Sequence, residues 1–258
     1  MSRDHAMRAH AGFTLPALSD DTSAPHDEHR FILWNIAILL ISALLLTMLS
    51  RDGKIDFALA DLFFDHKGDE FPLRDLPILA TYGHTWLKNL TTLFWLACMP
   101  LAIASFWYRP LYQWRSILFK FVIFAGCTAY VVQSLKSGSP HACPWDVTQF
   151  GGQAHWFPLF DMTGATSTDG RCWPGGHASG GFALVAIYFA ARTTRPTLAL
   201  SGLLLGLYLG CLMGLIQMMR GAHFLSHNLW SLWIVWAVCF ALDRVWSAIA
   251  QRALGHHK

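Results

Sequence analysis

The sequence predicts an all-α polytopic membrane protein with six transmembrane helices and an interfacial cap on the outer side of the membrane. Three observations support this fold class. The 258 residues are 54% hydrophobic and only 14% charged, whereas soluble globular proteins carry about 25% charged residues. Twelve Trp and 18 Phe accompany this shortage of charge. Apolar stretches of about 20 residues, the length that crosses a bilayer, also recur along the chain.

Composition excludes several other classes of protein. A disordered chain, a collagen-like repeat and a small disulfide scaffold each need a composition that this sequence lacks. The net charge of +3 is small, and no basic helix or aromatic-basic stripe accompanies it. We therefore expect a lipid bilayer as the surroundings and no nucleic-acid partner.

The six predicted spans differ in strength. The first follows a polar tail and lacks a small-residue cleavage site, which favours an anchor over a removed signal peptide. Asn89 and Pro100 interrupt the second, and the fourth is short for a span and opens with the sequence Gly-His-Ala-Ser-Gly-Gly. The predicted spans are residues 31–50, 88–107, 116–135, 177–192, 197–219 and 226–250.

The distribution of Lys and Arg predicts how these spans are oriented. Short cytoplasmic connections are enriched in both residues. The long loop 137–176 contains one cation, Arg171, whereas three segments that six spans would place on the opposite face are basic. We therefore expect both termini inside and the long loops outside. The basic residues of those three segments are Arg109 and Arg115, Arg192 and Arg195, and Arg244, Arg252 and Lys258.

Four regions follow from this topology. They are a cytoplasmic tail (1–30), the first span with an outer interfacial segment (31–87), a helical core (88–250) and a second cytoplasmic tail (251–258). In the outer segment, DFALADLFFD alternates acidic with apolar residues, as is typical of a short amphipathic helix in the membrane interface. An ordinary surface loop with one helical turn is the alternative.

Cysteine positions agree with this arrangement. Cys143 and Cys172 both fall in the outer loop, where a disulfide persists, and we expect them to pair. Closing a loop of about 30 residues would restrict the unfolded chain by roughly 3–4 kcal/mol in the entropic model. Two unpaired thiols are the alternative. The other four cysteines fall inside spans, where a free thiol behaves as a small apolar group.

Three polar clusters gather at the predicted outer boundary, at residues 135–146, 172–180 and 220–228. Gly175 and Gly176 begin a helix, where free backbone N–H groups favour an anion, and Lys136 and Arg220 add positive charge. Two histidines at separate helix ends can act as nucleophile and acid. This combination is suited to phosphoryl transfer through a phosphohistidine. The histidines in or near the clusters are His141, His155, His177, His223 and His227.

Other interpretations of these histidines remain. His84 and His155 fit amphipathic anchors at the membrane interface. His223 and His227 have the four-residue spacing of a metal pair on a helix, so a zinc site is an alternative. His141, Cys143, Cys172 and His177 also include metal-ligand types, although no Cys-x-x-Cys or His-x-x-x-His pair joins those two clusters.

In order and spacing, the clusters resemble the motifs of the type 2 phosphatidic acid phosphatase family. That family has Lys, six residues, Arg-Pro; then Pro-Ser-Gly-His; then Ser-Arg, five residues, His, three residues, Asp. Here Lys136 is followed after six residues by Cys143-Pro144, the sequence Pro-Gly-Gly-His ends at His177, and three residues separate His223 from His227. The resemblance covers about residues 88–250.

The resemblance implies a metal-independent phosphatase without a cofactor. His223 would be the nucleophile and His177 the acid that protonates the leaving oxygen. Lys136 and the N–H groups of Gly175 and Gly176 would hold the phosphate oxygens. With His223 neutral and His177 protonated, we expect a bell-shaped rate profile between about pH 5 and 8.

Four positions depart from the family pattern. Cys143 replaces the Arg of the first motif, Gly175 the Ser of the second, Gln217 the Arg of the third, and His227 the final Asp. We expect Arg220, one turn nearer, to supply the missing cation. The group that orients His223 is expected to be His227, Asn228, Asp146 or Asp161.

The resulting hypothesis is a lipid phosphate or diphosphate phosphatase that acts at the outer leaflet of a bacterial inner membrane. The resemblance suggests undecaprenyl diphosphate, phosphatidylglycerol phosphate, phosphatidic acid or lipid A as substrates, and nothing in the sequence chooses among them. A phosphotransferase between two lipids and a non-enzymatic transporter or channel are the alternatives. The oligomeric state stays open.

Overall fold

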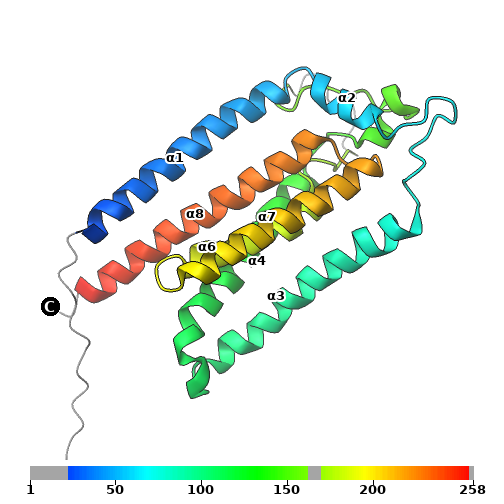
Figure 1. The fold of residues 1–258 in the computed structure, drawn as a ribbon. Helices are drawn as coiled ribbons and strands as arrows, with labels where there is room; N and C mark the ends of the chain where they lie inside the picture. The colour runs from blue at the N-terminus through cyan, green and yellow to red at the C-terminus, as the bar shows by residue number, and fades with distance from the viewer. Residues whose placement is uncertain (1–22, 162–169, 256–258) are drawn as a thin grey trace, which may run out of the picture. The chain divides into compact units, whose positions relative to one another are not determined.

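A computed structural model of the chain describes residues 23–161 and 170–255. The described residues form helices joined by loops, with isolated β-bridges and no strand (Figure 1). The chain divides into two compact units, Met1–Ile38 and Leu39–Lys258, and the helix packing and the site described below belong to the second. The α-helices are α1 (Ser23–Leu49), α2 (Lys54–Asp61), α3 (Leu87–Ala104), α4 (Arg115–Ser137), α5 (Gly176–Phe182), α6 (Ala186–Ala191), α7 (Pro196–Met219) and α8 (Leu225–Gly255). The shorter helical turns are η1 (Ile78–Trp86), η2 (Arg109–Trp114), η3 (Pro144–Asp146), η4 (Thr148–Phe150) and η6 (Ala183–Val185).

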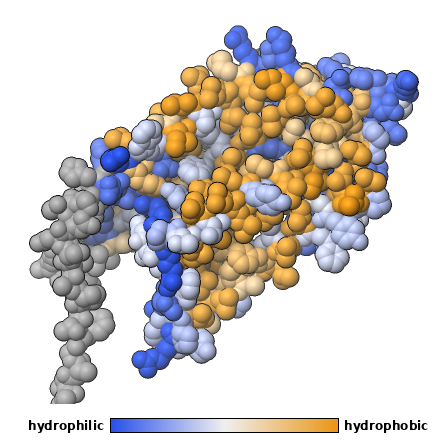
Figure 2. Space-filling view, viewed as in Figure 1, coloured by the Kyte–Doolittle hydropathy of each residue, from blue (hydrophilic) through white to orange (hydrophobic). Residues whose placement is uncertain are grey.

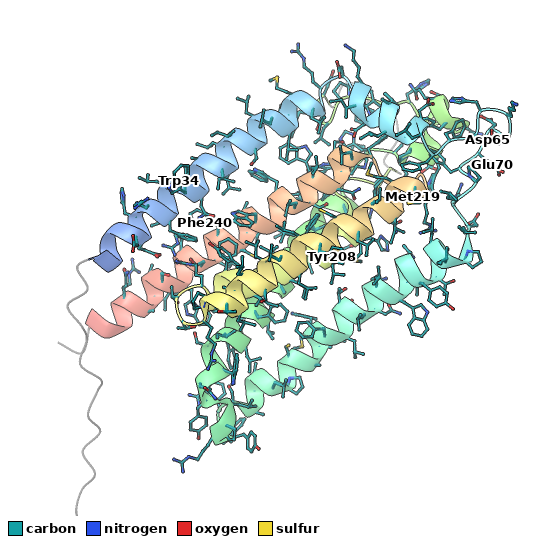
Figure 3. The ribbon with its side chains drawn as sticks, viewed as in Figure 1. Trp34, Asp65, Glu70, Tyr208, Met219 and Phe240 are labelled. Carbon is teal, nitrogen blue, oxygen red and sulfur yellow. A yellow bond between two sulfur atoms is a disulfide. The ribbon has the colours of Figure 1, made fainter. Side chains whose placement is uncertain are left out.

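Five of these helical segments are long and apolar enough to cross a membrane. They confirm the predicted polytopic all-α class, and their outer surfaces are rich in apolar side chains (Figure 2). Tyr208 on α7, for example, is an exposed aromatic residue (Figure 3). The five segments are Asp27–Leu49, Ile78–Ala104, Arg109–Ser137, Pro196–Met219 and Leu225–Arg252.

The predicted fourth span is the exception. It is the shorter apolar helix Gly176–Ala191, made of α5, η6 and α6. At about 1.5 Å per residue its 16 residues span roughly 24 Å, less than the hydrocarbon thickness of about 30 Å. Val185, Ala186 and Phe189 are buried, because α4, α7 and α8 surround this helix. Contact with protein, rather than with lipid, explains why a short helix is sufficient there.

The second span begins ten residues earlier than the sequence predicts. The helix runs continuously from Ile78 to Ala104, so residues 78–87 belong to a span and not to the interfacial segment. Its first part, η1, is π-helical. Gly83 in η1 faces Ile216 of α7, and a Cβ atom on Gly83 would lie 2.9 Å from the Ile216 side chain. Of the polar residues that make this stretch look less like a span in the sequence, His84 contacts the site described below.

Glycines on α7 allow α5 and α6 to approach closely. Gly202, Gly206, Gly210 and Gly214 recur every fourth residue and therefore lie on one side of α7, a pattern that favours close helix packing in membranes. A Cβ atom on Gly210 would lie 2.0 Å from the ring of Phe182 in α5. The glycine face of α7 thereby determines where α5 sits.

A second apolar core covers the end of the helices where the polar clusters lie. Phe57 of α2 packs edge-to-face on Phe224, with ring centroids 5.6 Å apart. Phe64, Phe71 and Phe150 complete the aromatic group. The loop after α2 doubles back at Asp65 and Glu70, which pair through their backbones (Figure 3). The expected amphipathic helix is thus present as α2, packed on protein through its apolar side.

Asp56 joins this cap to α8. The carboxylate of Asp56 accepts a hydrogen bond of 2.9 Å from the Ser226 N–H and another from the Ser226 hydroxyl. An acidic group at this position satisfies free N–H groups in the first turn of α8. Burial raises the pKa of Asp56, and the hydrogen bonds from Ser226 oppose that rise. The contact ties α2 to the residues that directly follow His223.

Candidate active site

The three polar clusters meet at one end of the helices. Lys136 lies in the last turn of α4, His177 in the first turn of α5, and His223 in the loop between α7 and α8. The chain segments touch directly, because the Gly175 N–H donates a hydrogen bond of 3.0 Å to the carbonyl of His227. Residues that are 87 positions apart in sequence, Lys136 and His223, therefore belong to one region of the fold.

The turn before α5 is anchored on α8. Besides the bond from Gly175 to His227, the Ser231 hydroxyl donates to the carbonyl of Gly175 over 2.9 Å. A Cβ atom on Gly175 would lie 2.5 Å from Oδ1 of Asn228, which explains why glycine occupies this position. The Gly175 N–H is engaged within the protein. It is therefore not the free phosphate donor that the sequence predicts. Gly176 remains the glycine assigned to that contact.

A cavity of about 330 Å³ opens beside this turn. Lys136, Gly176 and His177 line it, so three of the predicted site residues share one space. The aliphatic part of Lys136 lies against Gly176, where a Cβ atom would be 3.4 Å from Cδ of the lysine. The remaining polar lining comes from Lys88, Thr91, Thr92, Gln133 and Ser179.

His223 is buried beside this cavity rather than exposed in it. Its residue surface is only 4% exposed, and it is not among the residues that line the cavity. Burial lowers the pKa of His223 well below its ordinary value, and the charges of Lys136, His227 and His177 lower it further. The imidazole of His223 is therefore neutral at physiological pH, and it lies within electrostatic range of the other cluster residues.

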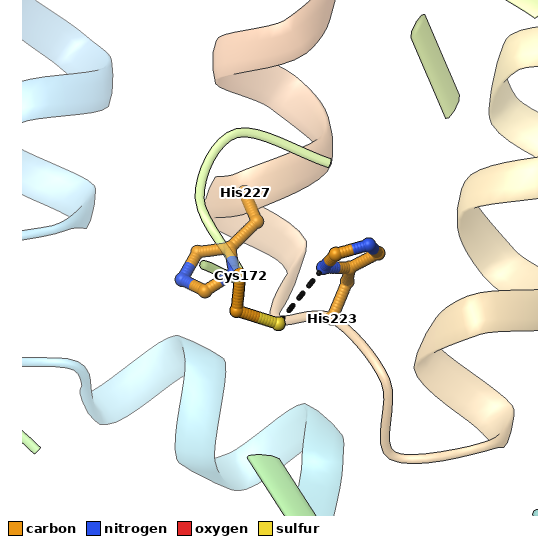
Figure 4. Close-up of side chains that lie close together, drawn as sticks. All are labelled: Cys172, His223 and His227. Atoms are coloured by element: carbon orange, nitrogen blue, oxygen red, sulfur yellow. Dashed lines mark hydrogen bonds between the residues drawn. The ribbon is translucent and has the colours of Figure 1, made fainter. Parts of the chain in front are cut away.

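Cys172 faces the ring of His223 with its sulfur atom and with its backbone. Cys143 and Cys172, which are 29 positions apart in the chain, form the disulfide that the sequence predicts. Sγ of Cys172 lies 3.3 Å from Nδ1 of His223 (Figure 4). The same sulfur lies 2.9 Å from the carbonyl oxygen of Ala222. Because a disulfide sulfur has no hydrogen, only His223 can be the donor in the contact with Nδ1.

Three of the four residues expected to orient His223, namely His227, Asn228 and Asp146, make other contacts or none. The His227 ring centroid lies 6.0 Å from that of His223, and Nδ1 of His227 is buried without a hydrogen-bond partner among the described residues. Asn228 donates from Nδ2 to the carbonyl of Gly214 over 3.2 Å. Asp146 accepts a bond from the Trp145 indole. Cys172 lies at the ring of His223, where the sequence predicts His227, Asn228 or an aspartate.

Arg220 is held between the cap and α7. Its Nε donates to the carbonyl of Arg74 over 2.8 Å, and a terminal nitrogen contacts Oε1 of Gln217 at 3.4 Å. Gln217, which stands where the family motif has Arg, is buried and bonds to the guanidinium of Arg220. Arg220 lies within electrostatic range of His177. The guanidinium of Arg220 is thus near the site, but two of its nitrogen atoms are already bonded to Arg74 and Gln217.

Sequence reasoning missed His84. The His84 ring, in η1, lies against the ring of His177 with centroids 3.9 Å apart. No local pattern distinguishes His84 from an interfacial anchor, because the contact depends on how η1 packs against α5. His141, by contrast, is a buried packing residue. Its Nε2 lies 3.1 Å from the carbonyl of Leu159, and its ring packs on Phe157.

A metal ion would need different chemistry at position 172. Ligand atoms of Cys172, His223 and His227 lie within 4.8 Å of one another, which is close enough to hold an ion (Figure 4). Zinc binds a cysteine as the thiolate. The Cys172 sulfur is bonded to Cys143 and cannot supply one while the disulfide is intact. The donor set therefore does not fit the zinc alternative in the oxidised protein.

Comparison with known proteins agrees with the motifs. The family model described as the PAP2 superfamily matches residues 117–250, which is more than half of the chain and includes all three clusters. No curated protein and no solved structure matches the sequence.

Proposed function

The chain belongs to the PAP2 superfamily of phosphatases, and we propose that it removes a terminal phosphate from a membrane lipid through a phosphohistidine on His223. The family and the apolar spans make the chain a membrane phosphatase. The observation that carries the proposal is the shared cavity of Lys136, Gly176 and His177 beside the buried His223. A cation, a backbone donor, a proton donor and a neutral imidazole are the groups that this reaction needs.

The first chemical step transfers the phosphoryl group to the protein. Nε2 of His223 attacks phosphorus, and the bond between phosphorus and the leaving oxygen breaks. His177 gives a proton to that oxygen, while Lys136 and the Gly176 N–H stabilise the equatorial oxygens of the transition state. Nε2 of His177 is buried without a hydrogen-bond partner among the described residues, so the leaving oxygen of a bound phosphate can take that place. The negative charge of the bound phosphate favours the protonated ring that this step needs.

Water completes the cycle. The same His177, now neutral, takes a proton from a water molecule that attacks the phosphohistidine. The bond between phosphorus and Nε2 breaks, inorganic phosphate leaves, and both histidines regain their initial states. No metal or cofactor is required at any point in this sequence of steps.

The disulfide supports His223 as the nucleophile. If Nδ1 donates its proton toward Sγ of Cys172, the other ring nitrogen carries the free electron pair. A carboxylate is the usual partner for such a ring. A disulfide sulfur is a weaker acceptor than a carboxylate. Unlike a carboxylate, it is uncharged, so no negative charge is buried beside the ring. Because His223 does not line the cavity, a side-chain shift has to accompany binding of the phosphate.

Phosphate release by the purified protein tests this proposal. In detergent with a chelator, the wild-type protein should release phosphate from at least one substrate in a panel of lipid monophosphates and diphosphates. His223→Ala should abolish release, because no phosphohistidine forms. His141→Ala is the matched control, since this buried histidine lies outside the cavity. Equal activity of His223→Ala and the wild type would disprove the mechanism, and a labelled second lipid in place of free phosphate would identify a phosphotransferase.

Substrate access from the outer leaflet is part of the proposal. The only cation in the loop 137–176 is Arg171, whereas the opposite connections are rich in Arg. The catalytic groups lie at the helix ends that adjoin this loop. The lipid head group would therefore enter from the exterior or the periplasm of a bacterial inner membrane.

A further inference from the structure

The cavity contains a second group of polar residues that the proposed phosphatase mechanism does not use. Lys88, Thr91 and Thr92 of α3 line it together with the catalytic groups, and Gln133 of α4 adds an amide. The three α3 positions are spaced three and four residues apart and therefore share one side of the helix. His84 lies four residues before Lys88, at the same side, where its ring meets His177.

A lysine in this position needs an explanation. Lys88 belongs to the membrane span Ile78–Ala104, and charged residues within spans are costly and usually functional. In the described part of the chain, no carboxylate forms an ion pair with it. Its charge faces a cavity that already holds the cation of Lys136. Two lysines in one space favour a ligand with more negative charge than a single phosphate group.

The positions of the two lysines relative to His177 indicate which part of the substrate each would bind. Lys136 packs against Gly176, and the proposed mechanism puts the scissile phosphate between these two residues. His177 protonates the leaving oxygen, so whatever lies beyond His177 contacts the leaving group. His84 touches His177 from α3's side, and Lys88 lies one helical turn further along. A leaving group that is itself a phosphate would place its charge at Lys88.

We propose that Lys88, with Thr92 and Gln133, forms a subsite for a second phosphate, and that the protein prefers lipid diphosphates over lipid monophosphates. This inference rests on the proposed phosphatase function. In the step concerned, the bridging P–O bond breaks while the terminal phosphorus bonds to Nε2 of His223. The bridging oxygen accepts the proton of His177, and a lipid monophosphate leaves. Lys88 stabilises the charge that this leaving phosphate gains in the transition state.

Farnesyl diphosphate and farnesyl monophosphate provide a matched pair of substrates, since they differ by one phosphate. For purified wild-type protein in detergent, we expect kcat/KM to be at least tenfold higher for the diphosphate. Lys88→Gln should lower the ratio of the two kcat/KM values at least tenfold, and Lys88→Arg should restore most of it because the charge returns. Lys120→Gln should leave the ratio unchanged, because Lys120 lies over Trp246 and does not line the cavity.

Each outcome has a distinct meaning. An unchanged ratio in Lys88→Gln, or a loss that Lys88→Arg does not restore, would overturn the subsite while the phosphatase function stands. If the wild-type protein releases phosphate from neither farnesyl substrate nor any lipid in the panel, the proposed function itself fails. A second measurement does not depend on turnover. Inorganic pyrophosphate should raise the melting temperature of the wild-type protein more than phosphate does, and Lys88→Gln should remove that difference.

Discussion

At the scale of single residues, the site departs from its family pattern in a physically connected way. The carboxylate that ends the third family motif is absent from position 227, and a disulfide sulfur lies beside His223, the proposed nucleophile. The same disulfide uses Cys143, which replaces an arginine of the first motif. One covalent bond therefore accounts for two departures. Asn228 explains a third departure, the glycine at position 175, because it occupies the space where a serine side chain would lie.

If the sulfur itself orients His223, two cysteine variants should differ. Cys143→Ser and Cys172→Ala both remove the disulfide, but only the second removes the sulfur next to Nδ1. We expect kcat of Cys172→Ala to fall about tenfold below that of Cys143→Ser, the size of other losses of an orienting partner. Melting temperatures of the two variants should agree. Equal kcat values would mean that only the covalent link matters.

The environment of His223 also predicts the pH dependence of the rate. Attack requires an unprotonated nitrogen, and a histidine whose pKa is lowered stays neutral down to a lower pH. The acid limb of kcat/KM should therefore lie well below pH 6.5, the ordinary value for histidine. Lys136→Met removes a positive charge that lowers this pKa, so the limb should move upward. A wild-type limb at or above pH 6.5 would contradict the assignment of His223.

At the scale of helices, the placement of α5 depends on close backbone contact. Gly181 faces α7 so tightly that a Cβ atom would lie 2.5 Å from the Gly210 nitrogen. Its neighbour Gly180 has room, since the nearest atom to a Cβ there is 3.7 Å away. Backbone atoms cannot rotate aside as side chains do. The first turn of α5, and His177 within it, thus depends on two glycines that meet.

Alanine substitutions at these two neighbours should have opposite effects. Gly181→Ala should lower the free energy of unfolding by about 1–3 kcal/mol, the usual cost of forcing extra volume into a packed core. Gly180→Ala should be neutral or stabilising by up to about 1 kcal/mol, because alanine favours helix more than glycine does. Thermal unfolding in detergent measures both. A stable Gly181→Ala protein would show that α5 can move away from α7.

At the scale of the whole molecule, the number of crossings determines which side of the membrane each terminus occupies. The five long segments alone would leave the termini on opposite sides. If the buried Gly176–Ala191 helix is a sixth crossing, we expect both termini on the same side. The charge distribution then predicts that this side is the cytoplasm.

Reporter fusions distinguish the two topologies. A fluorescent protein that matures only in the cytoplasm should be active at either terminus. An alkaline phosphatase that folds only outside should be active when it is inserted in the loop 137–176. We expect the sixth crossing because the 16-residue helix Gly176–Ala191 is buried against protein and does not have to face lipid along its length. Activity of the exported reporter at the C-terminus would rule out the sixth crossing.

The sequence by itself determined the membrane class, the ends of most spans, the disulfide pair and three of the residues that line the cavity, namely Lys136, Gly176 and His177. These follow from local properties, namely apolar length, residue spacing and the compartment in which a disulfide persists. Tertiary structure alone decided the partners of those residues. Three contacts join segments that are distant in the sequence. They are His84 with His177, the Cys172 sulfur with His223, and Asp56 with Ser226. Such contacts depend on how closely helices pack, which the glycines of α7 permit but which no short stretch of sequence specifies.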